Sequence, residues 1–350
     1  METKQLSEKP TIHLVTGLGA AALAAGPLRK TKAQSFLFSV AVQQLLTWYF
    51  TSKRDAAKKK LPIAVAENSK SADVNGIRMR WEEHGTANAD GVPVVLVHGL
   101  PTNPRVWRYV IPNLTEKKRQ CLAYELVGFG WSMKEGCGRD ISVAAQAEYL
   151  YQWLQYLGVS KAVFVAHDLG GAVVQRLAAN KPELFAGLVL IDSASPDNLP
   201  ATINWITKFA PGGIDNLSPT LLNPLFKGMM ASLGHSSKVV KHESLKLFWA
   251  PYNWSGGPKA LAHQLHDFQS AEVLDTAEVL KSVELSIPKR VIWGEQDPLG
   301  LESATLLANA LKAPLITIPQ GKHFAVEDHA GVVSRQILEL LDELENRASV

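Results

Sequence analysis

The alternation of apolar runs with amphipathic segments from residue 74 onward most constrains the fold of this 350-residue chain. Continuous apolar runs of strand length are typical of buried parallel strands, and the longer amphipathic segments between them are typical of covering helices. This order predicts an α/β fold with a mainly parallel central sheet and helices on both faces. Strands are expected at 93–99, 121–126, 162–166, 187–193, 289–297 and 315–319, after a hairpin at 74–85, and helices at 104–115, 143–157, 170–181 and 329–346.

The alternation is interrupted at 195–285, where prolines and short apolar helices replace it. Ligands of open α/β sheets bind beyond the carboxyl ends of the strands, so we expect this insertion to be a helical cap over those ends. The sequence therefore predicts a core formed by 74–194 and 286–350, with the cap between them. An N-terminal hydrophobic and basic extension with a linker, residues 1–73, precedes the core.

Two apolar stretches, 14–28 and 35–50, lie in this extension, and a linker is expected at 56–73. Neither stretch reaches the roughly 20 apolar residues that a membrane-spanning helix needs. The first has the composition of a signal-peptide core, and the second, with its aromatic end and cationic flank, suits an anionic membrane surface. Membrane contact through residues 14–60 is one hypothesis. Helix packing on the main domain or a partner, and disorder, are the alternatives, and the localisation stays open.

The charge and cysteine content exclude several classes of partner. The net charge is +3, yet residues 1–60 hold ten Lys/Arg and three Asp/Glu, so they carry +7 and the remainder −4. A nucleic-acid reader is expected to carry its basic surface on the folded domain, so no nucleic-acid partner is predicted. Cys121 and Cys137 have no metal-binding spacing, the histidines are scattered, and no complete phosphate loop is present. We therefore predict free thiols, no metal and no cofactor.

The stretch VFVAHDLGG carries Asp168 where a predicted strand turns into a predicted helix. A strand that turns abruptly into a helix leaves no room for large side chains beside the apex, and Ala166 and Gly170 occupy those positions. Gly171 allows the helix to pack closely. This pattern is typical of the strand–nucleophile–helix elbow. It predicts that Asp168 projects above the sheet, with the backbone N–H of Leu169 pointing into the same space.

Two later strand ends supply the remaining groups that a nucleophile needs. Asp297 follows one strand in WGEQDPLG, and His323 follows another in PQGKHF, so the order is nucleophile, acid, histidine. Asp192 and Glu295 are the alternative acids. The HGLP turn places the backbone N–H of Leu100 near the elbow, where it is expected to form an oxyanion hole with the N–H of Leu169.

With these motifs in correct order, residues 92–345 resemble the α/β-hydrolase superfamily. HGLPTNPRVWRYVIPNL, AHDLGGAVVQRLA and WGEQDPL resemble more narrowly the branch of haloalkane dehalogenases and epoxide hydrolases. The resemblance implies a hydrolase in which Asp168 attacks a saturated carbon and forms an alkyl ester. Water activated by His323, with Asp297 orienting that histidine, then hydrolyses the ester.

The positions that would bind the leaving group differ from the family's pattern. Haloalkane dehalogenases place a halide-binding Asn after the HG pair and a Trp after the nucleophile, where this chain has Leu100 and Leu169. Replacement donors in the expected cap are Trp205, Trp249, Trp254, His263 and His266. The cap offers one tyrosine, Tyr252, where epoxide hydrolases of this family use two. The resulting wall is apolar, so we expect a hydrophobic small-molecule substrate and water as the partners. The candidate substrate-pocket residues are Phe129, Trp131, Trp205, Trp249, Tyr252, Trp254 and Phe324.

Two further histidines lie close to the predicted site. His167 precedes the nucleophile, so its ring is expected to point away from Asp168 and to pack in the core. His98 is interpreted as stabilising its turn, with a partner in the loop that carries Gly128 and Gly130. Two other functions stay open: an enzyme acting on an ester, a lactone or a C–C bond, and a non-catalytic protein that binds a ligand under the cap.

Overall fold

The computed structural model describes residues 68–86, 91–194, 211–267 and 286–348. Residues 64–216 and 225–350 form one compact unit, and Met1–Ile63 with Leu217–Pro224 form another. The possible membrane-contact segment at 14–60, Trp205 and both ends of the expected cap lie outside the described residues. Among the helices that are described, none is both long and apolar enough to cross a membrane.

Within the described residues the sheet has eight strands in the order β1-β2-β4-β3-β5-β6-β7-β8. The first two pair antiparallel with their neighbours, and all the others are parallel, as expected for an α/β fold. The strands are β1 (Ser69–Val74), β2 (Ile77–His84), β3 (Val94–Val97), β4 (Cys121–Glu125), β5 (Ala162–His167), β6 (Phe185–Ile191), β7 (Lys289–Gly294) and β8 (Leu315–Ile318).

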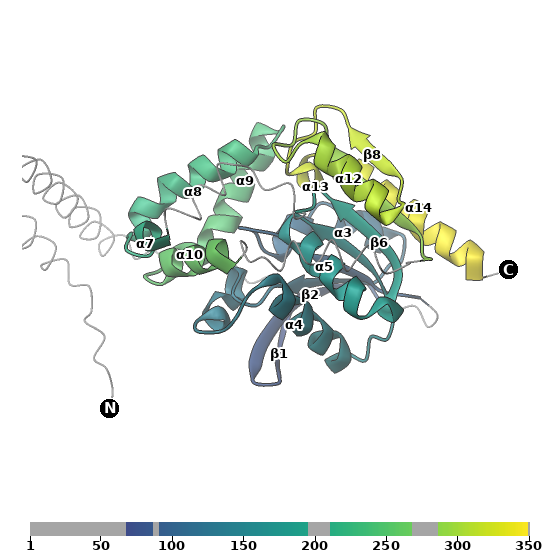
Figure 1. Ribbon diagram of the computed structural model, residues 1–350, viewed down its shortest axis with the longest axis horizontal. Coiled ribbons are helices and arrows are strands. Elements are labelled where there is room, and N and C mark those ends of the chain that lie inside the picture. The colour runs from purple at the N-terminus through teal and green to yellow at the C-terminus, as the bar shows by residue number, and fades with distance from the viewer. Residues whose placement is uncertain (1–67, 87–90, 195–210, 268–285, 349–350) are drawn as a thin grey trace, which may run out of the picture. The chain divides into compact units, whose positions relative to one another are not determined.

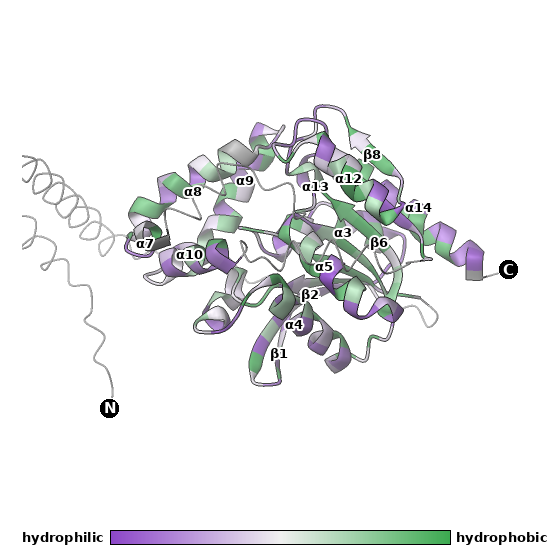
Figure 2. Cartoon of the chain, in the orientation of Figure 1, coloured by the Kyte–Doolittle hydropathy of each residue, from purple (hydrophilic) through white to green (hydrophobic). Residues whose placement is uncertain are grey.

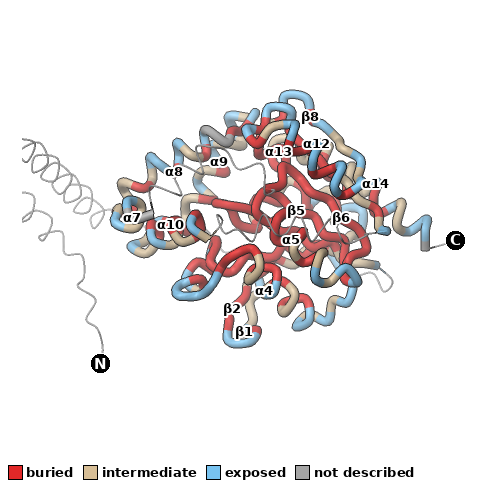
Figure 3. The backbone as a smooth tube through the Cα atoms, in the orientation of Figure 1, coloured by how far each residue is buried: buried red, intermediate tan, exposed pale blue. Residues whose placement is uncertain are grey.

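Helices flank the sheet because the central parallel strands are apolar on both faces. Every residue of β3, β5 and β6 is buried, and these strands form the hydrophobic, buried centre in Figures 2 and 3. The chain crosses from β3 to β4 in one direction and from β4 through β5 to β6 in the other. Right-handed crossovers therefore put α3 (Ile111–Glu116) on one face, and α4 (Val143–Tyr156) and α5 (Leu169–Asn180) on the opposite face. The C-terminal α14 (Ala330–Ala348) packs against α3 (Figure 1).

The N-terminal hairpin begins earlier than the sequence pattern predicts. Its turn is Asn75–Gly76, and both residues have positive φ, as a tight hairpin turn requires. The strand before the turn starts at Ser69, so residues 69–73, which we assigned to the linker, belong to the sheet. The pattern missed this strand because β1 is an edge strand whose side chains are mostly polar and only partly buried.

Two helical assignments also differ from expectation. The helix predicted at 104–115 is divided into a 3₁₀ turn, η1 (Pro104–Trp107), and α3. Pro112 accounts for the break, because proline lacks the N–H that a continuous helix would use and favours a helix start. No predicted element corresponds to α12 (Leu301–Leu311), which packs on β7 and β8 and is followed by Lys312 in the left-handed conformation.

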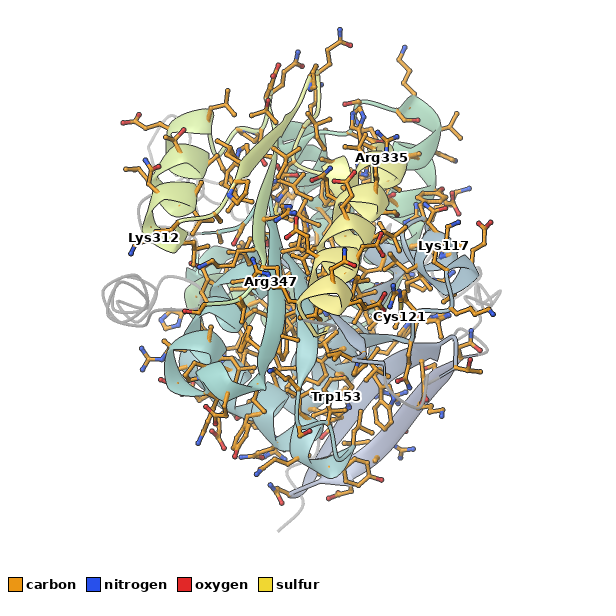
Figure 4. The ribbon with its side chains drawn as sticks, turned by 90° about the vertical axis from the view of Figure 1, so that its right-hand side faces the viewer. Lys117, Cys121, Trp153, Lys312, Arg335 and Arg347 are labelled. Carbon is orange, nitrogen blue, oxygen red and sulfur yellow. The ribbon has the colours of Figure 1, made fainter. Side chains whose placement is uncertain are left out.

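The two cysteines are free, as predicted. Cys121 opens β4 and is fully buried (Figure 4), which raises the pKa of its thiol to about 12. Trp153 of α4, also labelled there, is fully buried with its ring centroid 4.8 Å from that of Tyr124. Cys137 is exposed.

The helices between β6 and β7 are α7 (Pro211–Ile214), α8 (Pro219–Leu233), α9 (Lys238–Trp249) and α10 (Gly257–Asp267), with a 3₁₀ turn, η4 (Ala250–Tyr252). We call residues 225–267, from the second half of α8 to the end of α10, the helical insertion. Its hydrogen bonds to the rest of the unit go to loops that follow β3, β4 and β8. The carboxyl ends of parallel strands lie at one edge of the sheet, so the insertion contacts the edge where ligands of this fold class bind.

Candidate active site

Asp168 lies at the sharp turn between β5 and α5. Its backbone has φ 53° and ψ −125°, a strained conformation for any residue other than glycine. The neighbours leave no room for a larger side chain, because a Cβ at Gly99 would overlap the Asp168 carboxylate. A Cβ at Gly170 would likewise overlap the carbonyl oxygens of Val97 and His98. The crowding that the sequence predicted around this apex is therefore present.

The structure brings together the three side chains that the sequence proposed. The Nε2 atom of His323 lies 3.4 Å from Oδ2 of Asp168, and its Nδ1 atom lies 2.9 Å from Oδ2 of Asp297. The other carboxylate oxygen of Asp297 accepts a hydrogen bond from the backbone N–H of Leu299 at 2.7 Å. Glu295, one of the alternative acids, is exposed and accepts a hydrogen bond from Thr317 instead.

The two oxygens of the Asp168 carboxylate have different surroundings. Oδ1 accepts a hydrogen bond of 2.8 Å from the backbone N–H of Leu100, and the N–H of Leu169 also bonds this carboxylate. Oδ2 faces His323. Burial alone would raise the pKa of Asp168, but the close contact with the His323 imidazole and the hydrogen bond from the Leu169 N–H outweigh burial and lower it. Asp168 is therefore an ionised carboxylate with one oxygen held and the other turned toward the imidazole.

The pKa of His323 reflects its two acidic neighbours. Burial alone would lower the pKa, but the Asp297 and Asp168 carboxylates outweigh it and raise the pKa well above the ordinary 6.5. The 3.4 Å separation from Asp168 is within ion-pair range and longer than a normal hydrogen bond. Among the described residues, Nε2 of His323 has no hydrogen-bond partner. This nitrogen can therefore still donate or accept a proton.

His98 stabilises its turn, as predicted, with a partner close to the expected loop. Its Nε2 accepts from the backbone N–H of Leu126 at 3.1 Å, so the proton resides on Nδ1, which donates to the carbonyl of Gly99 at 3.0 Å. Burial is the main cause that lowers the pKa of His98 to about 4. This neutral imidazole holds the turn that presents the Leu100 N–H.

His167 packs in the core but has a second contact that the sequence did not indicate. Its Nε2 donates to the backbone carbonyl of His323 at 2.8 Å, and the two ring centroids are 5.0 Å apart. Burial and the nearby His323 lower the pKa of His167 to about 4, so it is neutral. It therefore ties the elbow strand to the loop that carries His323.

Some of the described substrate-pocket candidates lie outside the helical insertion, and the others lie within it. Phe129 and Phe324 are buried, and Trp131 is 40% exposed. Two of the candidate donors in the insertion already have partners, because Tyr252 donates to Gln264 at 2.6 Å and Trp254 donates to Met133 at 3.4 Å. His263 and His266 both pair with Asp267, and Trp249 packs on Phe226. In the described structure, none of these donors makes a hydrogen bond or ion pair with Asp168.

A buried polar cluster, which we call the insertion anchor, joins the helical insertion to the segment after His323. Glu327 of α13 (Ala325–Asp328) accepts hydrogen bonds from His235 at 2.6 Å and Ser244 at 2.8 Å, and forms an ion pair with Arg108. The His235 ring also stacks on Phe324, with 4.3 Å between centroids. Sequence reasoning missed this cluster because His235 and Glu327 are 92 residues apart and no local pattern links them.

No group of three or more His, Cys, Asp or Glu side chains within the described ranges has the arrangement of a metal site. The arrangement can instead provide a carboxylate, an imidazole, a second acid and two backbone N–H groups. A sequence profile described as the alpha/beta hydrolase fold matches residues 92–330, which is more than half of the chain. The chain belongs to the α/β-hydrolase fold family.

Comparison with known proteins shows which members of this family the chain is similar to. A haloalkane dehalogenase from Bradyrhizobium diazoefficiens is 27% identical over 293 residues, which cover 76% of this chain and 91% of that protein. A bifunctional epoxide hydrolase 2 from Sus scrofa is 34% identical over 108 residues, which cover 31% of this chain and 19% of that protein. An alpha/beta hydrolase fold protein from Burkholderia ambifaria has the same fold, with a TM-score of 0.69 at 23% identity over 79% of this chain and 98% of that one. The protein is thus a hydrolase of the α/β-hydrolase fold family, and it is similar in sequence to haloalkane dehalogenases and to an epoxide hydrolase.

Proposed function

We propose that this protein opens a carbon–halogen or epoxide carbon–oxygen bond of a hydrophobic small molecule through a covalent alkyl ester on Asp168. The observation that carries the proposal is the state of the Asp168 carboxylate. One oxygen is held 2.8 Å from the Leu100 N–H, and the other lies 3.4 Å from His323. A carboxylate is a poor attacker of esters, because it leaves again more easily than an alkoxide, but it is a competent attacker of saturated carbon.

In the first step, Oδ2 of Asp168 attacks the carbon that carries the leaving group. The new C–O bond forms as the carbon–halogen or epoxide carbon–oxygen bond breaks, and the bonding electrons leave with the halide or the alkoxide oxygen. The ionised state of Asp168 suits this step, since its pKa is lowered. The two backbone N–H groups fix the carboxylate, so its attack requires little reorganisation.

In the second step, His323 removes a proton from water, and the hydroxide adds to the carbonyl carbon of the ester. The Leu100 and Leu169 N–H groups then bind the negative oxygen of the tetrahedral intermediate. Collapse releases the alcohol, which takes its proton from His323, and returns the Asp168 carboxyl. Formation of the ester changes the pKa of His323 between the two steps. It removes the Asp168 charge that raises the pKa of His323, so the imidazole becomes a better-matched base once the ester has formed.

The substrate class follows from the side chains at the two amide positions and from the relatives. Leu100 and Leu169 are both buried and apolar, so they favour a hydrocarbon group over a sugar or a polyanion. The similar protein from Bradyrhizobium diazoefficiens is named a haloalkane dehalogenase, which favours a haloalkane as the first substrate to test.

The test is a panel of haloalkanes, epoxides, esters and lactones, assayed with the wild type, Asp168→Asn and His323→Gln. We expect His323→Gln to accumulate an alkyl adduct on Asp168, which intact mass and peptide mapping detect. A single turnover in heavy-oxygen water places the label in the Asp168 carboxyl. No adduct and no label with any halide or epoxide would contradict the proposal. Turnover of an ester by Asp168→Asn would favour the alternative in which Asp168 is not the nucleophile.

A further inference from the structure

Asp192 is a buried acid that the proposed reaction does not use. It follows β6 directly, as Asp297 follows the neighbouring strand β7, and the two strands pair in parallel up to Ile191 and Ile292. Asp192 is 0% exposed. Its Oδ1 accepts a hydrogen bond of 2.8 Å from the backbone N–H of Gly294, and the Asp297 side chain lies close enough to raise the pKa of Asp192.

The other oxygen of Asp192 raises a problem if both acids are ionised. Oδ2 is buried and, among the described residues, has no hydrogen-bond donor as a partner. Asp297 cannot supply one in its ionised form, since a carboxylate only accepts hydrogen bonds. Two adjacent buried carboxylates also repel each other, and one of them then keeps its proton. A single proton between the two acids removes both difficulties.

We propose that Asp192 carries this proton and donates it from Oδ2 as a hydrogen bond to Asp297. Asp192 is then a positioning residue, because it touches neither substrate nor reacting atoms and acts on His323 through Asp297. The ionised acid is Asp297, because its two oxygens already accept from the Leu299 N–H and from His323 Nδ1.

The charged and titratable groups that face Asp192 agree with this assignment. Burial and the charge of Asp297 raise the pKa of Asp192 well above its ordinary 3.8, and the opposing effects of His323 and of the Gly294 N–H do not reverse the shift. The donated hydrogen bond withdraws negative charge from Asp297. It therefore limits how far Asp297 raises the pKa of His323, which has to lose its proton before it can activate water.

Two substitutions test whether the Asp192 side chain acts as a neutral hydrogen-bond donor or as an ionised acid. Asp192→Asn keeps an N–H donor toward Asp297 and a carbonyl acceptor for Gly294, so we expect His323 to titrate at an unchanged pH. Asp192→Leu removes the donor, and we expect it to raise the pKa of His323 by on the order of one unit, measured by NMR. The link to catalysis rests on the proposed function, and turnover is expected to fall more in Asp192→Leu than in Asp192→Asn.

Infrared spectroscopy of the full chain tests the proton itself and needs no substrate. We expect the wild type to show an un-ionised carboxylic acid band at neutral pH that Asp192→Asn reduces. Glu125→Gln is the matched control, because burial raises the pKa of Glu125 to about 7 and this acid contributes its own band. A band that Asp192→Asn leaves intact would overturn the inference, as would a His323 pKa that changes equally in Asn and Leu. The band without turnover on any substrate would instead contradict only the proposed function.

Discussion

The elbow around Asp168 and the helical insertion differ in how their polar groups are used. At the elbow, Oδ2 of Asp168 faces an imidazole nitrogen that has no hydrogen-bond partner within the described structure. In the insertion, the polar groups of Tyr252 and Trp254, which the sequence offered as substrate contacts, already donate to Gln264 and Met133. The free imidazole nitrogen beside Asp168 can take part in proton transfer, whereas the hydroxyl of Tyr252 and the indole N–H of Trp254 serve to join elements of the structure. Changes at the elbow should therefore alter turnover, and changes in the insertion should alter stability.

The largest effect is expected at the elbow itself. Asp168→Asn replaces the nucleophile by a group of the same size, so we expect turnover to fall at least about 10⁴-fold, while the protein stays folded. Steady-state kinetics and thermal unfolding measured on the same sample check this. Substantial residual turnover would place the nucleophile elsewhere and would end the distinction between the two regions.

The insertion anchor is expected to show the largest effect on stability. Glu327→Gln leaves the buried Arg108 guanidinium without its buried charge partner, so the free energy of unfolding should fall by about 3–5 kcal/mol. Glu243→Gln is the matched control, because Glu243 is 3.7 Å from the same arginine but its side chain is 52% exposed. The control should cost less than about 1 kcal/mol. Equal losses in urea unfolding would show that burial does not set the strength of these pairs.

Gly99→Ala tests the elbow without replacing any polar side chain. A Cβ at this position overlaps the Asp168 carboxylate, so the nucleophile has to move, and turnover should fall about 10²-fold. Gly228→Ala in α8 is the control, since a Cβ there has open space around it. We expect the control to keep full turnover and to gain about 0.5–1 kcal/mol of stability. A normal rate in Gly99→Ala would show that the carboxylate position tolerates displacement.

Tyr252→Phe tests whether the Tyr252 hydroxyl stabilises the helical insertion or takes part in the reaction. The change leaves the buried Gln264 without the donor at 2.6 Å, so it should cost about 1–3 kcal/mol of stability, with turnover nearly unchanged. Tyr109→Phe removes an exposed hydroxyl–carboxylate bond and should cost less. If Tyr252→Phe lowered turnover of epoxides more than that of haloalkanes without lowering stability, Tyr252 would be an acid for the leaving oxygen.

The smallest effect expected is a pH dependence of stability. The Asp168–His323 attraction requires both charges, and it lowers the pKa of Asp168 from 3.8 and raises that of His323 above 6.5. The stabilisation from His323 is therefore complete below pH 6.5 and is lost as the pH rises through the raised pKa. The stability difference between the wild type and Asp168→Asn should be largest between about pH 4 and 6.5 and should shrink above it. Urea unfolding across this range measures the difference, and a difference that stays constant would mean that the two groups do not interact.

The same contrast explains which features could be predicted from the sequence. The elbow depends on a local backbone turn, so small residues next to Asp168 in sequence were enough to identify it. Asp297 and His323 could be placed because parallel strand ends meet at one edge of the sheet. The hydrogen bond from Gln264 to the carbonyl of Gly128 joins residues 136 positions apart, and no local spacing encodes such a contact. The sequence pattern likewise gives no sign that Gln264 accepts the hydrogen bond of Tyr252.

The position of Glu327, four residues after His323, has a consequence for how molecules enter and leave. The segment 323–328 carries both the imidazole and the carboxylate that secures the insertion. A hinge opening of the insertion would break the bond between His235 and Glu327 and would pull on the histidine loop. Rotation of a part-exposed side chain such as Trp131 breaks no such bond. Exchange of substrate and product is therefore expected to follow the fast timescale of rotamer changes, with the helical insertion held in place.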